Sequence, residues 1–232
     1  METVDQYVIP APSVPCLPVR NRRAGFPVHR IYCVGRNYAA HAIEMGHDPN
    51  RESPFFFLKN PDNLVTDGGD FPYPAKTEDV HHEVELVVAI GKGGRDIDSD
   101  EALDHVWGYA VGLDMTRRDL QAEMKKSGRP WEVSKAFEHS APCSAVVPAS
   151  EIGHPVEGRV ELRVNGDVRQ QGNLNQLIWK VPEIVSCLSG WFELRPGDLI
   201  MTGTPAGVGP VKRGDLVECS IDGVGELATR VV

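Results

Sequence analysis

The sequence predicts an α+β protein dominated by β-sheet, with a small number of short helices. Short segments rich in valine, isoleucine and leucine recur at regular intervals through the second half of the chain. Turn sequences such as Asn165-Gly166 and Asp222-Gly223 separate these segments, as expected between neighbouring strands. The strands do not alternate regularly with helices, and no repeat of fixed period is present. A parallel βαβ architecture is therefore not expected.

Strands are predicted where β-branched and aromatic residues cluster between glycine, proline, asparagine and aspartate. The run at residues 84–90 is apolar throughout apart from one glutamate and ends at Gly91, which is typical of a buried strand. A second run closes at Asp114 and presents that carboxylate at its end. The predicted strands are residues 31–34, 55–59, 84–90, 107–115, 160–164, 168–172, 199–202, 216–221 and 228–232, and residues 60–74 are predicted to form a loop.

Helices are predicted at four places. The first covers residues 37–45 and stops at Gly46, because glycine commonly ends a helix. The second covers residues 99–106, with Ser99 as its N-cap. The remaining two are residues 116–126 and 181–187.

The first 28 residues differ in composition from the rest and are predicted to form a proline-rich N-terminal arm. Proline excludes a helix interior, so we expect an extended segment laid on the surface. The basic cluster of this segment is Arg20, Arg22 and Arg23, and its prolines are Pro10, Pro12, Pro15, Pro18 and Pro27.

Composition excludes several classes of protein. The chain has 232 residues, of which 41% are hydrophobic and 25% charged, as in a globular protein. It has no apolar stretch long enough to cross a membrane, and its net charge of −9 disfavours nucleic acid as a partner. Five scattered cysteines without Cys-x-x-Cys spacing, together with the absence of a visible secretory signal, predict a reducing, cytoplasmic location.

Two carboxylates, Glu83 and Glu85, stand at the head of the apolar run 84–90. Side chains at positions i and i+2 of a strand share a face and lie about 6.6 Å apart along it. Two anions on an apolar wall repel each other and lose hydration, so they require a cation. With Asp114 they offer three oxygen ligands, which suit Mg²⁺ or Mn²⁺. The alternative is that both glutamates lie at a solvated strand end and pair with lysine or arginine.

His41 and Glu44 are three residues apart on the first predicted helix, so their side chains lie on one face and can touch. A carboxylate beside an imidazole orients it and favours its protonated form. This arrangement suits a general base that takes a proton from water. The alternative is an ordinary surface pair of histidine and glutamate.

Basic residues near these segments could receive a carboxylate of a substrate: Arg36, Arg118 and Lys135. The alternative for the helix 116–126 is a solvated basic face that carries Arg117, Arg118, Lys125 and Lys126. The glycine-rich segment 201–210 is not a phosphate loop, because no Gly-Lys-Ser/Thr follows. It is expected to form a tight loop that turns backbone N–H groups and the Thr204 hydroxyl toward a cleft.

Five motifs occur in one order along the chain. They are Cys33-Val-Gly-Arg-Asn-Tyr-Ala-Ala-His41-Ala-Ile-Glu44, His82-Glu83-Val-Glu85-Leu, Gly112-Leu-Asp114-Met-Thr-Arg-Arg118-Asp-Leu-Gln121, Pro130-Trp-Glu-Val-Ser-Lys135 and Thr202-Gly-Thr-Pro-Ala-Gly-Val-Gly. In this order the chain resembles the fumarylacetoacetate hydrolase family, particularly its short acylpyruvase and fumarylpyruvate hydrolase branch. The resemblance covers residues 29–232, which it implies are the catalytic domain.

The resemblance implies a mixed β-sandwich roll with a lid helix, and usually a homodimer. It implies that Glu83, Glu85 and Asp114 hold Mg²⁺ or Mn²⁺. It further implies that His41 and Glu44 activate water from the lid helix, and that four residues contact the substrate, namely Arg118, Gln121, Lys135 and Thr204.

The implied activity is hydrolysis of the carbon–carbon bond of a 2,4-dioxo acid, with fumarylpyruvate cleaved to fumarate and pyruvate. Lys135 suits stabilisation or protonation of the pyruvate enolate, and Arg36 or Arg51 could receive the distal carboxylate. Decarboxylation of oxaloacetate and isomerisation of an unsaturated dioxo acid are alternatives that use the same metal and enolate chemistry. A non-enzymatic, metal-bound structural protein would leave the histidine–glutamate pair and the three carboxylates without a task.

Overall fold

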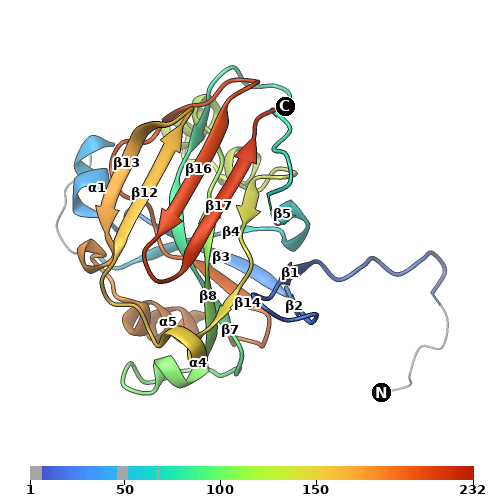
Figure 1. Ribbon diagram of the computed structural model, residues 1–232, viewed down its shortest axis with the longest axis vertical. Coiled ribbons are helices and arrows are strands. Elements are labelled where there is room, and N and C mark those ends of the chain that lie inside the picture. Colours follow the sequence, from blue (N-terminus) through green and yellow to red (C-terminus); the bar gives the residue numbers. More distant parts are fainter. Residues whose placement is uncertain (1–6, 46–51, 67) are drawn as a thin grey trace.

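A computed structural model of the protein describes residues 7–45, 52–66 and 68–232. Two β-sheets pack against each other and a few short helices lie at their margins (Figure 1). The predicted α+β class and the β-sandwich roll are confirmed. None of the described helices is long and apolar enough to cross a membrane.

Within the described residues, the larger sheet has eight strands in the order β4-β3-β14-β7-β8-β10-β5, with β11 paired to β8. It is mixed, because β14 runs parallel to β3 and β10 runs parallel to β5 while the other pairs are antiparallel. Its strands are β3 (Arg30–Gly35), β4 (Phe55–Lys59), β5 (Leu64–Thr66), β7 (Val84–Ile90), β8 (Val106–Leu113), β10 (Ala141–Cys143), β11 (Val147–Pro148) and β14 (Asp198–Met201).

The smaller sheet is antiparallel and has the strand order β13-β12-β16-β17. Buried and exposed positions alternate along β17, so one face packs on the core and the other faces solvent. Its strands are β12 (Arg159–Val164), β13 (Asp167–Asn173), β16 (Leu216–Ile221) and β17 (Gly225–Arg230). The other strands form a hairpin of β1 (Cys16–Pro18) and β2 (Gly25–Pro27), and a small sheet of β6 (Val80–His82), β9 (Thr116–Arg117) and β15 (Gly209–Pro210).

Helices in the described part of the chain are short. α2 ends at Gly128, which has a left-handed backbone (φ 61°) and donates its N–H to the Lys125 carbonyl, so glycine is the favoured residue there. The helices are α1 (Ala39–Glu44), α2 (Arg118–Ser127), α3 (Glu132–Lys135), α4 (Ala149–Ile152) and α5 (Val181–Trp191), with 3-10 turns η1 (Pro61–Asn63), η2 (Ala102–His105) and η3 (Leu174–Gln176).

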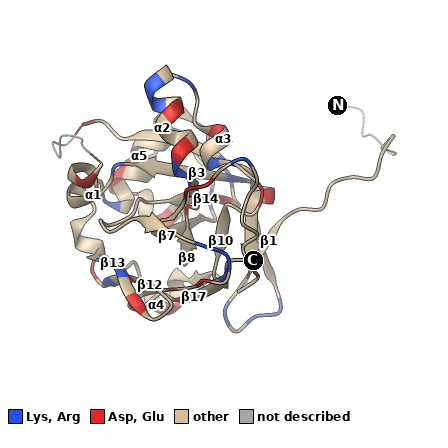
Figure 2. Ribbon diagram, turned by 90° about the horizontal axis from the view of Figure 1, so that it is seen from above, with Lys and Arg blue, Asp and Glu red and all other residues tan. Residues whose placement is uncertain are grey.

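The central strand β7 is buried on both faces and serves two cores. Leu86 and Val88 belong to the core between the two sheets. Val87 and Ala89 point the other way, into a second core enclosed by the curl of the larger sheet. The strands that contribute side chains to this second core are seen from above in Figure 2, namely β3, β14, β7, β8 and β10. The hairpin β1–β2 contributes further side chains to this second core, which are Leu17, Val19, Phe26 and Val28.

Residues 7–15 extend away from the domain rather than lying on its surface (Figures 1 and 2). The side chains of Tyr7, Val8 and Ile9 are exposed. The predicted division at residue 28 stays a prediction. On its N-terminal side, the hairpin packs into the second core.

Several predicted strands are confirmed with the same ends, namely 55–59 (β4), 84–90 (β7) and 216–221 (β16). The strands predicted at 31–34, 107–115, 160–164, 168–172 and 199–202 correspond to β3, β8, β12, β13 and β14. The last strand was placed too late, because β17 starts at Gly225 and pairs with β16 from there. The predicted loop 60–74 contains η1 and β5, and β5 is recruited as a strand by its parallel pairing with β10.

The predicted helices differ from the observed ones more than the predicted strands do. Residues 99–106 form only the 3-10 turn η2, without a side-chain cap from Ser99, because the His105 carbonyl accepts the Gly91 N–H and draws the chain into β8. The helix predicted at 116–126 starts at Arg118, since Arg117 pairs with Val80 in the small sheet. The helix predicted at 37–45 is α1, and its predicted stop at Gly46 lies outside the described residues. The helix predicted at 181–187 continues to Trp191 as α5.

Candidate active site and metal centre

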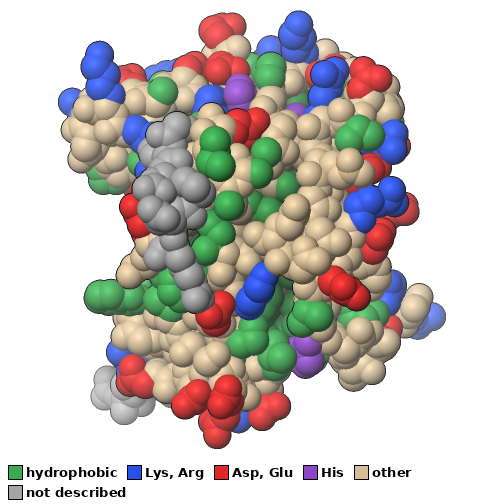
Figure 3. Space-filling view, turned by 90° about the vertical axis from the view of Figure 1, so that its left-hand side faces the viewer, with side chains coloured by type: hydrophobic (Ala, Val, Ile, Leu, Met, Phe, Trp, Pro, Cys, Tyr) green, Lys and Arg blue, Asp and Glu red, His purple; other side chains and the backbone are tan. Residues whose placement is uncertain are grey.

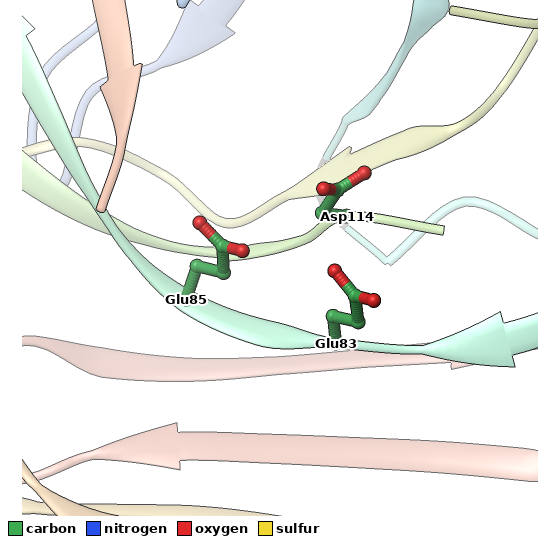
Figure 4. A group of neighbouring side chains, drawn as sticks. All are labelled: Glu83, Glu85 and Asp114. Carbon is green, nitrogen blue, oxygen red and sulfur yellow. The ribbon is translucent and has the colours of Figure 1, made fainter. Parts of the chain in front are cut away.

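Three carboxylates meet because of the register between β7 and β8. In this antiparallel pair Val84 lies opposite Leu113, so Glu83 lies opposite Asp114, and the Asp114 N–H donates to the Glu83 carbonyl at 2.9 Å. Glu85 is two residues further along and shares the face of Glu83. The three carboxylates approach a common point (Figure 4), with one oxygen from each within 4.8 Å of the others.

All three carboxylates are buried, and two of them are neutralised by protein cations. Lys135 donates to Glu83 at 2.8 Å and to Asp114 at 2.6 Å, which ties α3 to both strands. Lys59, the last residue of β4, lies 2.8 Å from the other oxygen of Asp114. Arg118, the first residue of α2, donates to Glu83.

Glu85 differs from its two neighbours. Among the described residues no cationic side chain forms an ion pair with it, and its Oε2 accepts only the Gly203 N–H, at 2.6 Å. Burial and the nearby charges of Asp114 and Glu83 therefore raise the pKa of Glu85 well above its ordinary value. For Glu83, burial raises the pKa, but the charges of Lys135 and Arg118 outweigh it and hold the pKa below its ordinary value.

The donor set fits a hard divalent cation. All three ligands are carboxylate oxygens, which Mg²⁺ and Mn²⁺ prefer over softer donors. Glu85 supplies the observation that tests the fit, because a buried carboxylate with no paired cation is costly. A divalent ion among the three carboxylates would compensate it. The protein thus carries a candidate Mg²⁺ or Mn²⁺ centre at Glu83, Glu85 and Asp114.

The predicted histidine–glutamate pair is present on α1. The Nδ1 of His41 lies 3.2 Å from Oε2 of Glu44, and His41 is buried. Glu44 also accepts the N–H of Gly207 at 2.9 Å, so the pair is held against the glycine-rich loop. With Nδ1 engaged, Nε2 is the ring nitrogen that remains for a water or substrate.

On the side of the molecule that carries α1, apolar side chains gather near the middle of the surface (Figure 3).

A buried glutamine fixes the direction of the Thr204 hydroxyl. Gln170 on β13 accepts the Val84 N–H with its Oε1 and donates its Nε2 to the Pro205 carbonyl, so its amide can face only one way. The same Nε2 lies 2.7 Å from Thr204 Oγ1 and must donate to it. Thr204 therefore accepts this bond, and its own proton is free to be donated into the cavity that it lines.

One cavity brings together most of the predicted site. Its lining includes the carboxylate triad and His41, whereas Glu44 contacts His41 without lining the cavity. The predicted substrate contacts line the same cavity, namely Arg36, Arg118, Gln121, Lys135 and Thr204. Arg51, the alternative to Arg36, lies outside the described residues.

Arg118 is already engaged within the protein. Its guanidinium donates to Glu83, to Gln121 Oε1 at 2.7 Å and to His81 Nδ1 at 3.3 Å. Because Oε1 of Gln121 is taken, the amide nitrogen is the group of Gln121 that is left for a ligand.

The sequence did not identify several residues of this site. Lys59 and Gln170 act through partners far away in the sequence, and no local motif marks either. Trp131 and Lys125 line the cavity. Trp131 stands inside the fourth motif, whereas the sequence offers for Lys125 only a place on a solvated helix face together with Lys126. In the structure Lys126 is exposed, but Lys125 is half-buried.

Comparisons with known proteins agree with this geometry. The family described as fumarylacetoacetate (FAA) hydrolase C-terminal matches residues 30–232. A crystal structure of fumarylpyruvate hydrolase from Pseudomonas aeruginosa, in complex with Mn²⁺ and pyruvate, is 55% identical, with a TM-score of 0.95. The alignment covers 98% of this chain and 99% of that one.

Two curated relatives carry different names at nearly the same identity. A fumarylpyruvate hydrolase of Ralstonia sp is 45% identical over 79% of this chain and 95% of its own. A mitochondrial oxaloacetate tautomerase of Mus musculus is 46% identical over 87% of this chain and 90% of its own.

Metal binding is predicted to release a proton from Glu85. Because its pKa is raised well above the ordinary value, Glu85 holds a proton at mildly acidic pH, and a cation beside it favours the charged form. The affinity for Mn²⁺ should therefore rise with pH. Titration calorimetry at mildly acidic pH, in two buffers of different ionisation enthalpy, should show that protons are released when the ion binds. Glu85→Gln should bind more weakly and release none. Equal heats in both buffers for the parent protein would contradict the assignment.

Proposed function

Because the chain belongs to the fumarylacetoacetate hydrolase family, whose members are metal-dependent enzymes acting on carbon–carbon bonds, we propose that it hydrolyses a 2,4-dioxo acid. The preferred substrate is fumarylpyruvate, and the products are fumarate and pyruvate. The observation that carries this proposal is a single cavity that holds both the carboxylate triad and His41. The name and bound pyruvate of the Pseudomonas aeruginosa structure support it.

Glu83, Glu85 and Asp114 would hold the metal. Bound there, Mg²⁺ or Mn²⁺ would act as a Lewis acid that stabilises negative charge on the oxygens of the dioxo acid. The carboxylate of the pyruvate half is held by the amide nitrogen of Gln121 and the hydroxyl proton of Thr204. Arg118 orients Gln121 through its hydrogen bond to Oε1.

Water activation is the task of the pair on α1. Glu44 accepts the Nδ1–H of His41, which leaves Nε2 to remove a proton from water. The resulting hydroxide adds to the carbonyl carbon distal to the pyruvate carboxylate. The bond from that carbon to the neighbouring methylene carbon then breaks. The acyl group leaves as a carboxylic acid, and the electron pair stays on the other fragment as pyruvate enolate. The proton that His41 took from water returns to the enolate carbon, which gives pyruvate and restores the base.

Lys135 stabilises the enolate charge. Burial lowers its pKa, but Asp114 and Glu83 outweigh burial and raise it above its ordinary value. The ammonium group therefore keeps its proton, which suits a fixed positive charge better than an acid. The same cation is held 5.1 Å from the centre of the Phe57 ring.

Oxaloacetate chemistry is the second candidate, and the name of the Mus musculus relative favours it. Loss of CO₂ from oxaloacetate also leaves pyruvate enolate, and tautomerisation moves a single proton. Decarboxylation requires neither attack by water nor a general base, so it would leave the contact of His41 with Glu44 unexplained, whereas tautomerisation could use the pair to move its proton. The pair therefore supports hydrolysis over decarboxylation, and the bound pyruvate of the Pseudomonas aeruginosa structure supports hydrolysis over tautomerisation.

We also propose a cytoplasmic homodimer. Exposed apolar side chains lie beside the edge strand β4, and such surfaces mark interfaces. They are Leu58, Trp191 and Phe192. Five free cysteines fit a reducing compartment. Sedimentation velocity should give twice the mass of the chain, and a monomer at micromolar concentration would contradict this assembly.

The proposed activity is tested by assay of the purified protein with Mg²⁺ or Mn²⁺ against three compounds. Fumarylpyruvate should give the highest kcat/KM, followed by acetylpyruvate and then oxaloacetate, because this ratio reports transition-state binding. Excess chelator should abolish turnover, and added metal should restore it. Full turnover in chelator, or a higher kcat/KM for oxaloacetate than for either acylpyruvate, would reject the proposal.

Loss of the histidine–glutamate pair should affect hydrolysis more than decarboxylation. His41→Ala and Glu44→Gln should each lower kcat for fumarylpyruvate by about 100-fold or more, the usual contribution of a general base. Any decarboxylation of oxaloacetate should fall less, because it needs no activated water. Ile43→Ala is a matched control, since this side chain lies on the same helix but is 59% exposed. Parental rates in both active-site variants would show that the pair has another role.

A further inference from the structure

We propose that Lys125 and Arg36 form a subsite for a second, distal carboxylate of the substrate, and that Phe55, Phe57 and Trp131 form the wall beside its acyl chain. The inference rests on the proposed function and narrows its substrate class to acylpyruvates that end in a carboxylate. It gives Lys125 and Trp131 a role, which neither the family resemblance nor the five motifs had assigned.

Three aromatic rings form one continuous wall of the cavity. The ring of Trp131 meets that of Phe55 edge to face at a centroid distance of 5.4 Å, and that of Phe57 at 5.8 Å. All three line the same cavity as the carboxylate triad. A flat, conjugated acyl chain such as a fumaryl group matches a wall of this kind, since both present planar apolar faces.

Cations lie over both ends of this wall. Lys135, which binds Glu83 and Asp114, lies over Phe57 and marks the end near the carboxylates. Lys125 lies over Trp131 with its ammonium 5.2 Å from the ring centre, and Arg36 lies over Phe55 at 5.4 Å. Besides Lys135, the wall therefore carries two further positive charges, Lys125 on α2 and Arg36 on the turn that follows β3.

These two cations differ from those at the carboxylate triad. Lys59, Lys135 and Arg118 each pair with a carboxylate of the triad. Within the described part of the chain, neither Lys125 nor Arg36 forms an ion pair with an acidic side chain. The Nε of Arg36 is buried without a hydrogen-bond partner there. Buried donors of this kind are costly unless a ligand satisfies them.

The position of Arg36 is fixed by its neighbour. Arg36 has a left-handed backbone (φ 57°), which is uncommon for a residue with a side chain. The side chain of Asn37 holds the turn, because it donates to the carbonyls of Trp179 and Thr202 and accepts the Trp179 N–H. The guanidinium is therefore presented to the cavity by a rigid turn.

The charge of Lys125 depends on what lies beside it. Burial, which is the largest cause, and the like charges of Arg118, Arg36 and Lys135 together lower its pKa to about 8, against an opposing contribution from Glu83. A carboxylate bound between Lys125 and Arg36 would relieve this repulsion and keep the ammonium charged. A substrate with an uncharged acyl end would leave the repulsion in place.

Variants on α2 test the subsite. Lys125→Met should lower the ratio of kcat/KM for fumarylpyruvate to kcat/KM for acetylpyruvate by about 10-fold or more, as expected for loss of a charged contact. Lys126→Met removes the same group from the next, exposed position and should leave the ratio at the parental value. An unchanged ratio in Lys125→Met, or an equal fall in Lys126→Met, would overturn the proposal.

The pH dependence of the same ratio gives a second readout that does not depend on a neutral variant. In the parent protein the ratio should fall as the pH rises through about 8, where free Lys125 loses its proton. In Lys125→Arg it should stay level, because a guanidinium remains charged. The same fall in Lys125→Arg as in the parent would overturn the subsite.

The two proposals fail in different ways. A parent protein that hydrolyses neither acylpyruvate overturns the proposed function and the subsite with it. A parent protein that hydrolyses both, with a ratio that responds neither to Lys125→Met nor to pH, overturns the subsite alone.

Discussion

Mutual repulsion among three buried carboxylates is the constraint on which the rest of this structure depends. Glu83, Glu85 and Asp114 are brought together by strand register, at a place where all three are buried and lose most of their hydration. Each surrounding element supplies a compensating group: Lys59 from β4, Lys135 from α3 and Arg118 from α2. Two carboxylates are compensated in this way and one is not, and that imbalance makes the centre suitable for a divalent ion.

The same constraint explains how the two sheets are joined at the site. Gln170 comes from the smaller sheet, yet its oxygen accepts the Val84 N–H beside Glu83 and its nitrogen holds the loop that carries Thr204. The next residue of that loop toward the N-terminus, Gly203, gives its N–H to Glu85. The loop, the central strand and the smaller sheet are therefore held by one connected network. A displacement of any one of them would disturb the carboxylates.

Local patterns predicted the parts of the site that are close in sequence. The spacing of Glu83 and Glu85 and the i, i+3 spacing of His41 and Glu44 each place two side chains on one face, whatever the rest of the fold. The position of Asp114 could be predicted because it directly follows β8, a strand that the sequence shows clearly. The central strands were equally clear, since a continuous β-branched run such as residues 84–90 has few alternatives.

The remainder depends on contacts that no local pattern contains. Lys59 looks like the solvated end of an apolar strand, and it is buried only because β4 ends beside Asp114. Residues 99–106 have a helical pattern, but the pairing of Gly91 with His105 stops them at one 3-10 turn. Lys125 and Lys126 are adjacent and chemically identical. Only the packing of α2 against Trp131 separates a cavity residue from a surface one.

Whole-chain sequence identity is no better guide to the reaction. At 45% and 46%, it does not separate a fumarylpyruvate hydrolase from an oxaloacetate tautomerase. Since both reactions pass through an enolate of pyruvate or oxaloacetate, the metal centre can serve either one, and the proposed aromatic wall is where a longer acyl chain would be told apart from oxaloacetate.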